Sequence, residues 1–382
     1  MKPARITIIG GGNGAFAAAG HLTLVGHQVT LFEMPAFQAS LDPIKKRGGK
    51  LKVKCLPSNH LPEGEAMLHK LTIDAREAME ESDIILVITP AQGHESIAKA
   101  IAPYVRSNHV IAITPGNFGG SIKFRNYLIA GGCEESVKVA EFETMPYATR
   151  KEKDENGEIV GPWIRGYKHG LGCSVFPSKN SDEIFNRLYD IYDILEKRDN
   201  VLVTGVSNVN TYGHPPCMVG SIQYIDKKEK PLMNEIKTES IAHIRKELDL
   251  EHMQLKNIGI NVVSAREITK SYYGYQNVSE GGKIDDLDPD DVWRHNKIYV
   301  DSKLPDDWNH RYLTEDIPFG LVPLEELLEQ YALPHPITTA CINFADLLCG
   351  KNFREEGAKL ADCGLKGLTL SQLHQYLENG TY

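Results

Sequence analysis

The sequence predicts an α/β protein in which an N-terminal, doubly wound Rossmann-type sheet is followed by a mainly α-helical C-terminal domain. Short β-branched runs alternate with helical periodicity from residue 5 to about residue 203, a pattern typical of parallel strands joined by crossover helices. Helical spacing dominates after that point, and a length of 382 residues suits two domains. We therefore expect a nucleotide-binding domain at 1–204 and a helical domain at 205–382.

The elements of the first domain are expected where apolar runs and turn residues alternate. The first strand is RITII (5–9), and a helix follows in GAFAAAGHLTLVG (14–26). The charged, turn-rich stretch KEKDENGEIVGPW (151–163) predicts an inserted hairpin loop. Further strands are expected at QVTLF (28–32), IILVIT (84–89), VIAIT (110–114) and VKVAEF (137–142), and the strand pattern fades after VLVTG (201–205).

In the second domain the helical spacing is clearest in four segments. These are 231–248, 321–333, 337–350 and 370–380. The acidic segment DDLDPDD (285–291) is expected to be a solvated loop, because its glycine and glutamate are misplaced for a calcium-binding loop.

The composition excludes several classes of function. Lys and Arg total 42 against 51 Asp and Glu, a net charge of -9, which disfavours nucleic acid and anionic membranes as partners. The seven cysteines form no CxxC pair, and no metal-ligand spacing stands out. The first apolar run is too short for a signal peptide or a membrane span. We expect a cytoplasmic protein with small-molecule substrates and no metal, and we allow for a homodimer.

A glycine motif follows the first strand directly. Gly10, Gly12 and Ala15 give G-x-G-x-x-A, and Asn13 and Gly14 open the helix. A tight glycine turn between a strand and a helix places free backbone N–H groups and the positive end of the helix dipole against a pyrophosphate. The motif therefore predicts a dinucleotide site.

Glu33 and the ends of later strands complete the expected cofactor site. Glu33 ends the second strand, where a carboxylate accepts hydrogen bonds from the adenosine ribose and repels a 2′-phosphate. Met34 and the two residues after it offer no positive charge, so NAD is favoured over NADP. The segments Thr89-Pro90-Ala91 and Thr114–Asn117 would line the carboxyl edge of the sheet, near the nicotinamide and the substrate.

Two motifs in the second half carry a resemblance. They are SNVNTYGHPP (207–216) and RYLTEDIPFGLVP (311–323). Together with the glycine motif, TPGNFGG (114–120), KSYYGY (270–275) and FREEGAKLADCGLKGLTLSQL (353–373), they closely resemble the opine dehydrogenase family, which includes octopine, nopaline and N-(1-carboxyethyl)-norvaline dehydrogenases.

The resemblance implies a function and roles for individual residues. The activity is the NADH-dependent reductive condensation of an amino acid with a 2-oxo acid, such as pyruvate, to a secondary amine dicarboxylate, and the reverse. His214 and Asp316 correspond to the family's catalytic pair, and Arg311 corresponds to its substrate-carboxylate arginine. Asn117 and Tyr212 are expected to be further substrate-binding residues.

The residues are consistent with these roles. Pro215 and Pro216 favour a helix start, so we expect a helix end to lower the pKa of His214 and Asp316 to oppose that effect. A histidine poised near neutrality can exchange the proton that interconverts an imine and a secondary amine. Two alternatives stay open: a 3-hydroxy acid or glycerol-3-phosphate type of dehydrogenase, which generally uses a lysine there, and a non-catalytic nucleotide-binding sensor.

Two polar segments depart from the family pattern. One is IDKKEKPLMNEIKTES (225–240), and the other spans 274–304. Both flank the expected entry of the amine substrate, so the sequence leaves the amino acid open. The side chains of Arg266, Lys270, Tyr272 and Tyr273 could line that pocket or form an exposed helix end.

Overall fold

The computed structural model describes residues 3–134, 136–276, 278 and 282–382. Two compact units make up the chain. The first is Met1–Gly116 with Gly120–Lys197, and the second is Asn117–Gly119 with Arg198–Tyr382. The units therefore divide between residues 197 and 198, where the sequence suggested 204 and 205, and a segment of three residues inside the first half belongs to the second unit.

The main sheet of the first unit has eight strands among the described residues, in the order β12-β11-β8-β7-β6-β1-β2-β5. Neighbouring strands are parallel except β8 and β11, which are antiparallel. This confirms the predicted fold class and adds an antiparallel pair near one edge. The strands are β1 (Arg5–Ile9), β2 (Gln28–Phe32), β5 (Lys70–Thr72), β6 (Ile84–Val87), β7 (Val110–Ile113), β8 (Val139–Phe142), β11 (Leu171–Phe176) and β12 (Leu195–Lys197).

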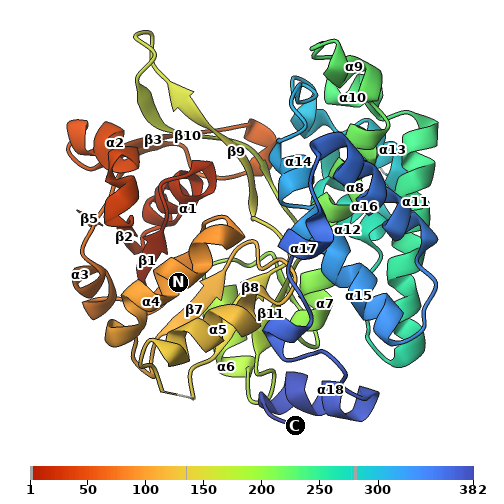
Figure 1. Cartoon of the computed structure of the whole chain (residues 1–382). Helices are drawn as coiled ribbons and strands as arrows, with labels where there is room; N and C mark the ends of the chain where they lie inside the picture. Colours follow the sequence, from red (N-terminus) through yellow and green to blue (C-terminus); the bar gives the residue numbers. More distant parts are fainter. Residues whose placement is uncertain (1–2, 135, 277, 279–281) are drawn as a thin grey trace. The chain divides into compact units, whose positions relative to one another are not determined.

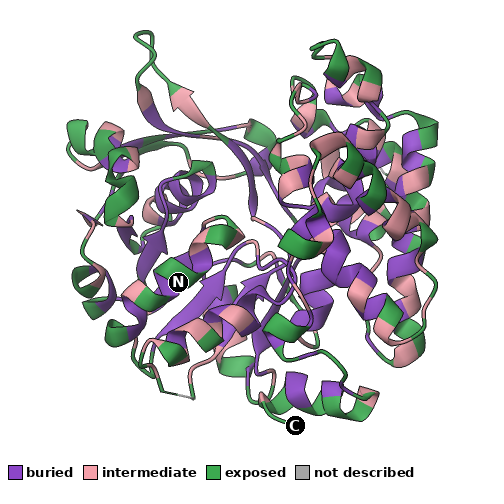
Figure 2. Ribbon diagram, viewed as in Figure 1, coloured by how far each residue is buried: buried purple, intermediate pink, exposed green. Residues whose placement is uncertain are grey.

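Helices pack against the sheet, because every residue of its central strands β6 and β7 is apolar. Every residue of β6 and β7 is buried, as the continuous apolar runs predicted (Figure 2). Ile97 and Phe124 of the flanking helices pack into a cluster with Val87 and Ile111. The helices are α1 (Asn13–Leu24), α2 (Asp42–Lys46), α3 (Ala75–Glu80), α4 (His94–Ile101), α5 (Gly120–Ala130) and α6 (Asp182–Tyr189).

A second sheet in the same unit contains the predicted hairpin. Its order is β4-β3-β10-β9, with β4 (Gly64–Met67), β3 (Lys50–Cys55), β10 (Ile159–Tyr167) and β9 (Tyr147–Lys153). The stretch 151–163 is thus more than an inserted loop. Its two strands pair with each other, β10 pairs with β3, and both strands contact α1 (Figure 1).

The second unit is helical, as predicted, with α8 contacting α11, α12, α14 and α16. Over the described residues, no helix is both long and apolar enough to cross a bilayer. The helices are α7 (Val201–Val206), α8 (Val209–Val219), α9 (Ile222–Asp226), α10 (Met233–Ile236), α11 (Glu239–Met253), α12 (Ala265–Tyr273), α13 (Pro289–Arg294), α14 (Arg311–Thr314), α15 (Val322–Gln330), α16 (Pro336–Cys349), α17 (Phe353–Glu356) and α18 (Leu370–Asn379).

The last predicted strand pattern, VLVTG, is wrong, because residues 201–205 lie in helix α7. The Asn200 side chain accepts hydrogen bonds from the backbone N–H groups of Leu202 and Val203, which starts the helix. All of α7 is buried, so its continuous apolar sequence reflects burial on every side and not a strand. Gly205 allows close packing, since a Cβ there would lie 3.2 Å from the Asn117 carbonyl oxygen.

Candidate functional site

The glycine turn after β1 has the geometry expected of a dinucleotide site. Gly10 has a φ of +126°, and a Cβ there would lie 2.6 Å from the Ile88 carbonyl oxygen, so only glycine fits. Around Gly12 there is open space: nothing lies within 4 Å of a Cβ built there. Gly12 caps α1 without a side-chain hydrogen bond, and Asn13 is exposed at the first helical position. Backbone N–H groups are thus presented to an anion.

The other two motif positions pack the turn against its surroundings. A Cβ at Gly14 would meet Met145 at 1.9 Å, and Ala15 is fully buried. Small side chains at both positions therefore keep the start of α1 close to its neighbours, which is the role of the third position of such motifs.

Glu33 lies beside the turn, as predicted. Its carboxylate accepts hydrogen bonds from Met34 N at 2.9 Å and from Ser40 Oγ at 3.3 Å. A Cβ at Gly11 would lie 2.9 Å from Glu33 Oε2. The turn and the carboxylate therefore fit a dinucleotide whose pyrophosphate meets the glycines and whose ribose meets Glu33.

Thr89 and Pro90 follow β6, as predicted, but only Thr89 contacts the turn. The methyl of Thr89 lies 3.1 Å from the position of a Gly10 Cβ. Pro90 is exposed and precedes a short 3-10 turn. The geometry supports Thr89 as a wall of the cofactor site and gives no contact role for Pro90.

Lys151 is a residue of this site that the sequence did not suggest. From β9 it donates a hydrogen bond to the Gly11 carbonyl at 2.9 Å, and its Nζ lies 4.4 Å from the Phe16 ring centroid. Burial lowers its pKa, and the charge of Glu33 opposes that shift. Because 140 residues separate the two bonded residues, only the fold brings this cation to the turn.

A second polar cluster that the sequence did not suggest consists of Glu143 and Thr144, which follow β8, and Lys168, which follows β10. Lys168 is buried, its ammonium donates to Thr144 Oγ1, and burial lowers its pKa to about 7. Glu143 accepts a hydrogen bond from Gly172 N at 3.0 Å and acts electrostatically on Lys168. The carboxyl end of a strand in such a sheet is a usual place for ligand contacts.

His214 and Asp316 form a direct pair in the second unit. The distance from His214 Nδ1 to Asp316 Oδ2 is 2.8 Å, and the two side chains are 20% and 3% exposed. Because a carboxylate only accepts hydrogen bonds, the proton belongs on Nδ1, and Nε2 keeps a lone pair. The ring of Tyr312 stacks on the imidazole with centroids 3.6 Å apart. Tyr312 was also missed by the sequence reasoning, although it stands next to Arg311.

The predicted helix start at Pro215 is wrong. Helix α8 begins at Val209, after the Asn208 side chain accepts a hydrogen bond from Asn210 N, and both prolines lie inside it. His214 is therefore not at the positive end of a helix. Its pKa is lowered by burial, whereas the charge of Asp316 and its hydrogen bond raise it, and the charges of Arg311 and Lys237 lower it further.

A close approach of two elements holds Asp316 beside α8. Asp316 precedes a π-helical turn, Ile317–Leu321. A Cβ at Gly320 would lie 2.4 Å from Thr211 Oγ1, so glycine lets that turn approach α8 directly. The glycine in the GLVP part of the motif thus fixes the distance between the carboxylate and the imidazole.

Arg311 offers a free part of its guanidinium near this pair. It begins α14, with its side chain 55% exposed, and its Nε donates to Glu315 Oε2 at 2.9 Å. Glu315 is buried, and burial raises its pKa. Within the described ranges, neither terminal nitrogen of Arg311 makes a hydrogen bond. Both can therefore bind a carboxylate side by side.

The two remaining predicted substrate residues support the scaffold. Asn117, at a φ of 55°, accepts a hydrogen bond from Asn208 Nδ2 at 2.9 Å and so links to the start of α8. Tyr212 is fully buried, and its hydroxyl donates to the Val206 carbonyl at 2.6 Å. Tyr212 of α8 therefore lies in the core, and its contacts give no support to the prediction that it binds substrate.

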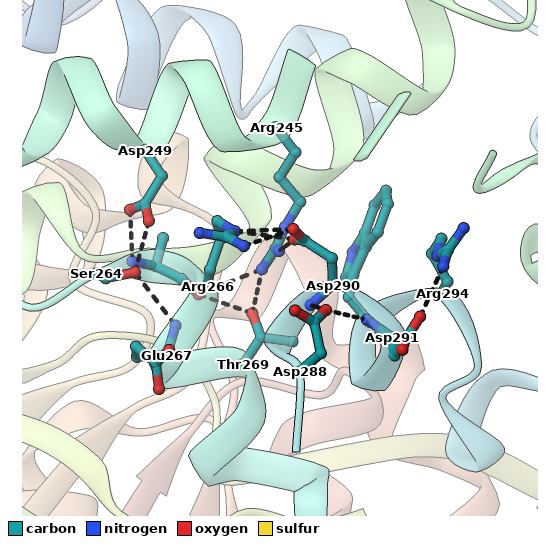
Figure 3. A network of polar contacts seen from close by, with 12 residues as sticks. Arg245, Asp249, Ser264, Arg266, Glu267, Thr269, Asp288, Asp290, Asp291 and Arg294 are labelled. Atoms are coloured by element: carbon teal, nitrogen blue, oxygen red, sulfur yellow. Dashed lines mark hydrogen bonds and ion pairs between the residues drawn. The ribbon is translucent and has the colours of Figure 1, made fainter. Parts of the chain in front are cut away.

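The acidic segment is also not a simple solvated loop. Asp288 caps α13, and Asp290 accepts hydrogen bonds from both Arg245 and Arg266 (Figure 3). Arg266 is thereby engaged in an ion pair, and Lys270 pairs with Glu267 at 2.7 Å. Tyr272 and Tyr273 are buried.

In the part of the chain that the structure describes, no group of three or more His, Cys, Asp and Glu side chains could hold a metal ion.

Comparison with known proteins shows what each part of the chain is similar to. Residues 197–349 match the model of the "NAD/NADP octopine/nopaline dehydrogenase, alpha-helical domain", and residues 5–128 match the N-terminus of NAD-dependent glycerol-3-phosphate dehydrogenase. An opine dehydrogenase of Arthrobacter sp. (strain 1C) is 28% identical over 373 residues, which cover 97% of this chain and 98% of the relative. The helical unit matches the opine dehydrogenase family, and almost the whole chain aligns with an opine dehydrogenase.

Octopine dehydrogenases are similar to this chain in length and fold. Octopine dehydrogenase of Pecten maximus is 24% identical over 93% of this chain and 92% of its own. A solved octopine dehydrogenase with NADH and L-arginine has a TM-score of 0.72 at 22% identity, with 99% of both chains covered. The glycerol-3-phosphate dehydrogenase match concerns only the first unit, so it leaves the helical unit as the family-specific part.

Proposed function

We propose that this opine dehydrogenase-family chain catalyses the reductive condensation of an amino acid with a 2-oxo acid, and the reverse oxidation. It is an NAD(P)-dependent oxidoreductase that acts on a CH–NH bond. The observation that carries the proposal is the His214–Asp316 hydrogen bond of 2.8 Å, with a partly free guanidinium on Arg311 acting on the same imidazole. The octopine dehydrogenase structures with L-arginine or pyruvate support these two classes of substrate.

NAD is the cofactor that the first unit fits. Gly10, Gly12 and the start of α1 would hold its pyrophosphate, and Glu33 its adenosine ribose. When bound, NADH supplies the hydride that reduces the imine carbon. Lys151 lies close enough to Glu33 to moderate its charge.

The chain's own residues manage the proton and the substrate carboxylate. The amino acid and the 2-oxo acid lose water to form an imine, whose reduction needs one hydride and one proton. We propose that the protonated His214 gives that proton to the nitrogen and that neutral Nε2 takes it back in the oxidation. Asp316 holds the tautomer and stabilises the imidazolium, while Arg311 binds the carboxylate of the 2-oxo acid.

The test is NADH oxidation with pyruvate and each common amino acid, followed by mass determination of the product. We expect consumption that requires both carbon substrates and a product mass equal to the two acids minus water plus two hydrogens. Oxidation with a 2-oxo or hydroxy acid alone would instead favour a hydroxy-acid dehydrogenase. No turnover with any pair would favour a nucleotide-binding sensor.

Glu33→Ser should narrow the preference for NADH over NADPH. The wild-type carboxylate repels a 2′-phosphate, whereas the variant leaves Lys151 as a nearby cation. We expect the ratio of kcat/KM for the two cofactors to fall by about tenfold or more. Glu95→Ser, at an exposed position of α4, is the control. A wild-type ratio near one would contradict the assignment of Glu33.

Asp316→Asn should move the acid limb of opine oxidation to lower pH. Oxidation needs neutral His214, so its rate falls as the pH drops through the pKa of that residue. Asp316 raises this pKa, and its removal therefore lowers it. We also expect turnover to fall by about 10 to 100-fold, since the imidazolium loses its counter-charge. The measurement is kcat/KM against pH with the purified product as substrate. An acid limb that stays at the same pH or moves to higher pH would argue against the pairing of His214 with Asp316.

Two further expectations remain predictions. None of the seven cysteines, all of which lie in the described ranges, forms a disulfide bond, which supports a reducing compartment such as the cytoplasm. Light scattering of the purified protein would measure whether it forms the homodimer allowed for by the sequence.

A further inference from the structure

Lys237 is a buried cation in the polar segment that departs from the family pattern. It follows α10 and is only 8% exposed. Its ammonium donates to the Trp293 carbonyl at 2.9 Å and lies 5.0 Å from the centroid of that tryptophan ring. One of its three donors is thus used.

No carboxylate of the described chain balances this charge. The side chains that shift the pKa of Lys237 by their charge are Cys217 and Arg245, and neither is a carboxylic acid. Arg245, which acts on Lys237, pairs with Asp290, and that carboxylate is shared by Arg245 and Arg266 (Figure 3). A buried ammonium without an opposite charge is costly, which explains why burial lowers its pKa to about 8.

Lys237 also lies next to the helix turn that carries the catalytic histidine. A Cβ at Gly213 would lie 3.3 Å from Trp293 Nε1, so the tryptophan that Lys237 covers packs against α8 beside His214. Cys217, one turn further along α8, is within electrostatic reach of the ammonium. Lys237 and Arg311 both lower the pKa of His214 by their positive charge.

The proposed reaction brings two carboxylates close to the imidazole. Its product carries one carboxylate from the 2-oxo acid and one from the amino acid, both attached to carbons on the same nitrogen. Arg311 can hold only one of them in a bidentate pair. We propose that Lys237 binds the carboxylate of the amino acid, which makes it a substrate-binding residue of the amine side.

This assignment rests on the proposed function and names its second carboxylate site. Binding of the amino acid would supply the negative charge that Lys237 lacks, and its two unused donors are available for it. It also explains why a lysine stands at a buried position: the counter-ion arrives with the substrate.

The experiment compares an amino acid with the amine that lacks its carboxylate. The best amino acid from the NADH oxidation screen and its decarboxylated amine are assayed with pyruvate, using wild type, Lys237→Met and the exposed control Lys246→Met. For Lys237→Met we expect kcat/KM for the amino acid to fall about 100-fold, mainly through KM. The values for the amine, pyruvate and NADH should change by less than about threefold.

A merely structural lysine would give a different result. Lys237→Met would then affect the amino acid and the amine equally, and that outcome would overturn the assignment. Lys237→Arg keeps the charge and should restore most of the preference for the amino acid. An active wild type with an unaffected Lys237→Met removes the inference and leaves the proposed function, whereas an inactive wild type removes the proposed function.

A binding measurement keeps the test valid if the methionine variant does not fold or the wild type shows no turnover. Calorimetry on wild type saturated with NAD⁺ compares iminodiacetate, which has two carboxylates on one secondary amine, with N-methylglycine, which has one. We expect iminodiacetate to bind at least about tenfold more tightly. Equal affinities would overturn the role of Lys237.

Discussion

His214→Ala should lower turnover in the reductive direction by roughly two to four orders of magnitude, which is the usual contribution of a general acid-base. The variant removes the imidazole that pairs with Asp316, which is the group that we propose exchanges the proton with the nitrogen. The affinity for NADH should stay near that of wild type, because the glycine turn and Glu33 belong to the first unit. Stopped-flow or steady-state kinetics measure the turnover, and quenching of the protein fluorescence on NADH binding measures the NADH affinity.

The control for this variant is His243→Ala, which changes an exposed histidine of α11. It should behave like wild type in both measurements. Turnover of His214→Ala within about threefold of wild type would remove the acid-base role. In that case Lys168, whose pKa burial lowers to about 7, would be the next residue to substitute.

Arg311→Lys should raise the KM for the 2-oxo acid by about 10 to 100-fold, while the KM for NADH changes little. The guanidinium uses its Nε for Glu315 and keeps two terminal nitrogens for a carboxylate. A lysine ammonium has one nitrogen for both tasks, so it either leaves Glu315 or binds the substrate at a single point. The measurement is steady-state kinetics with the 2-oxo acid varied at saturating amino acid and NADH.

Arg294→Lys serves as the matched control, since Arg294 also pairs with carboxylates at the surface of α13. An unchanged KM for the 2-oxo acid in Arg311→Lys would mean that Arg311 holds Glu315 and not the substrate. The KM for the amino acid separates this site from that of Lys237, because Arg311→Lys should affect it less than the KM for the 2-oxo acid.

The sequence predicts what depends on neighbours along the chain. Gly10 and Gly12 lie at the turn between β1 and α1, and Glu33 follows β2, because a strand, a turn and a helix are local structures. The main helices of the second half also follow from local periodicity. The pairing of His214 with Asp316, 102 residues apart, came from the family resemblance, and the structure brings the two side chains together.

What the sequence does not predict depends on packing between distant segments. Lys151 reaches the glycine turn because β9 contacts α1, and a charged stretch gives no sign of that. Tyr212 faces the core because α8 starts at Val209, whereas the prolines suggested a later start. Residues 201–206 form a helix because the Asn200 cap and burial on all sides outweigh their β-branched composition.

The segment Asn117–Gly119 makes the second unit depend on three residues that are encoded within the first. These three residues come between β7 and α5 of the first unit, yet Asn117 bonds Asn208 at the start of α8, and Phe118 N bonds the Phe319 carbonyl at 3.3 Å. A gene fragment for residues 198–382 would lack both partners, so the helical unit would be left with an incomplete interior. The two units therefore cannot be exchanged between proteins by a single crossover at their boundary.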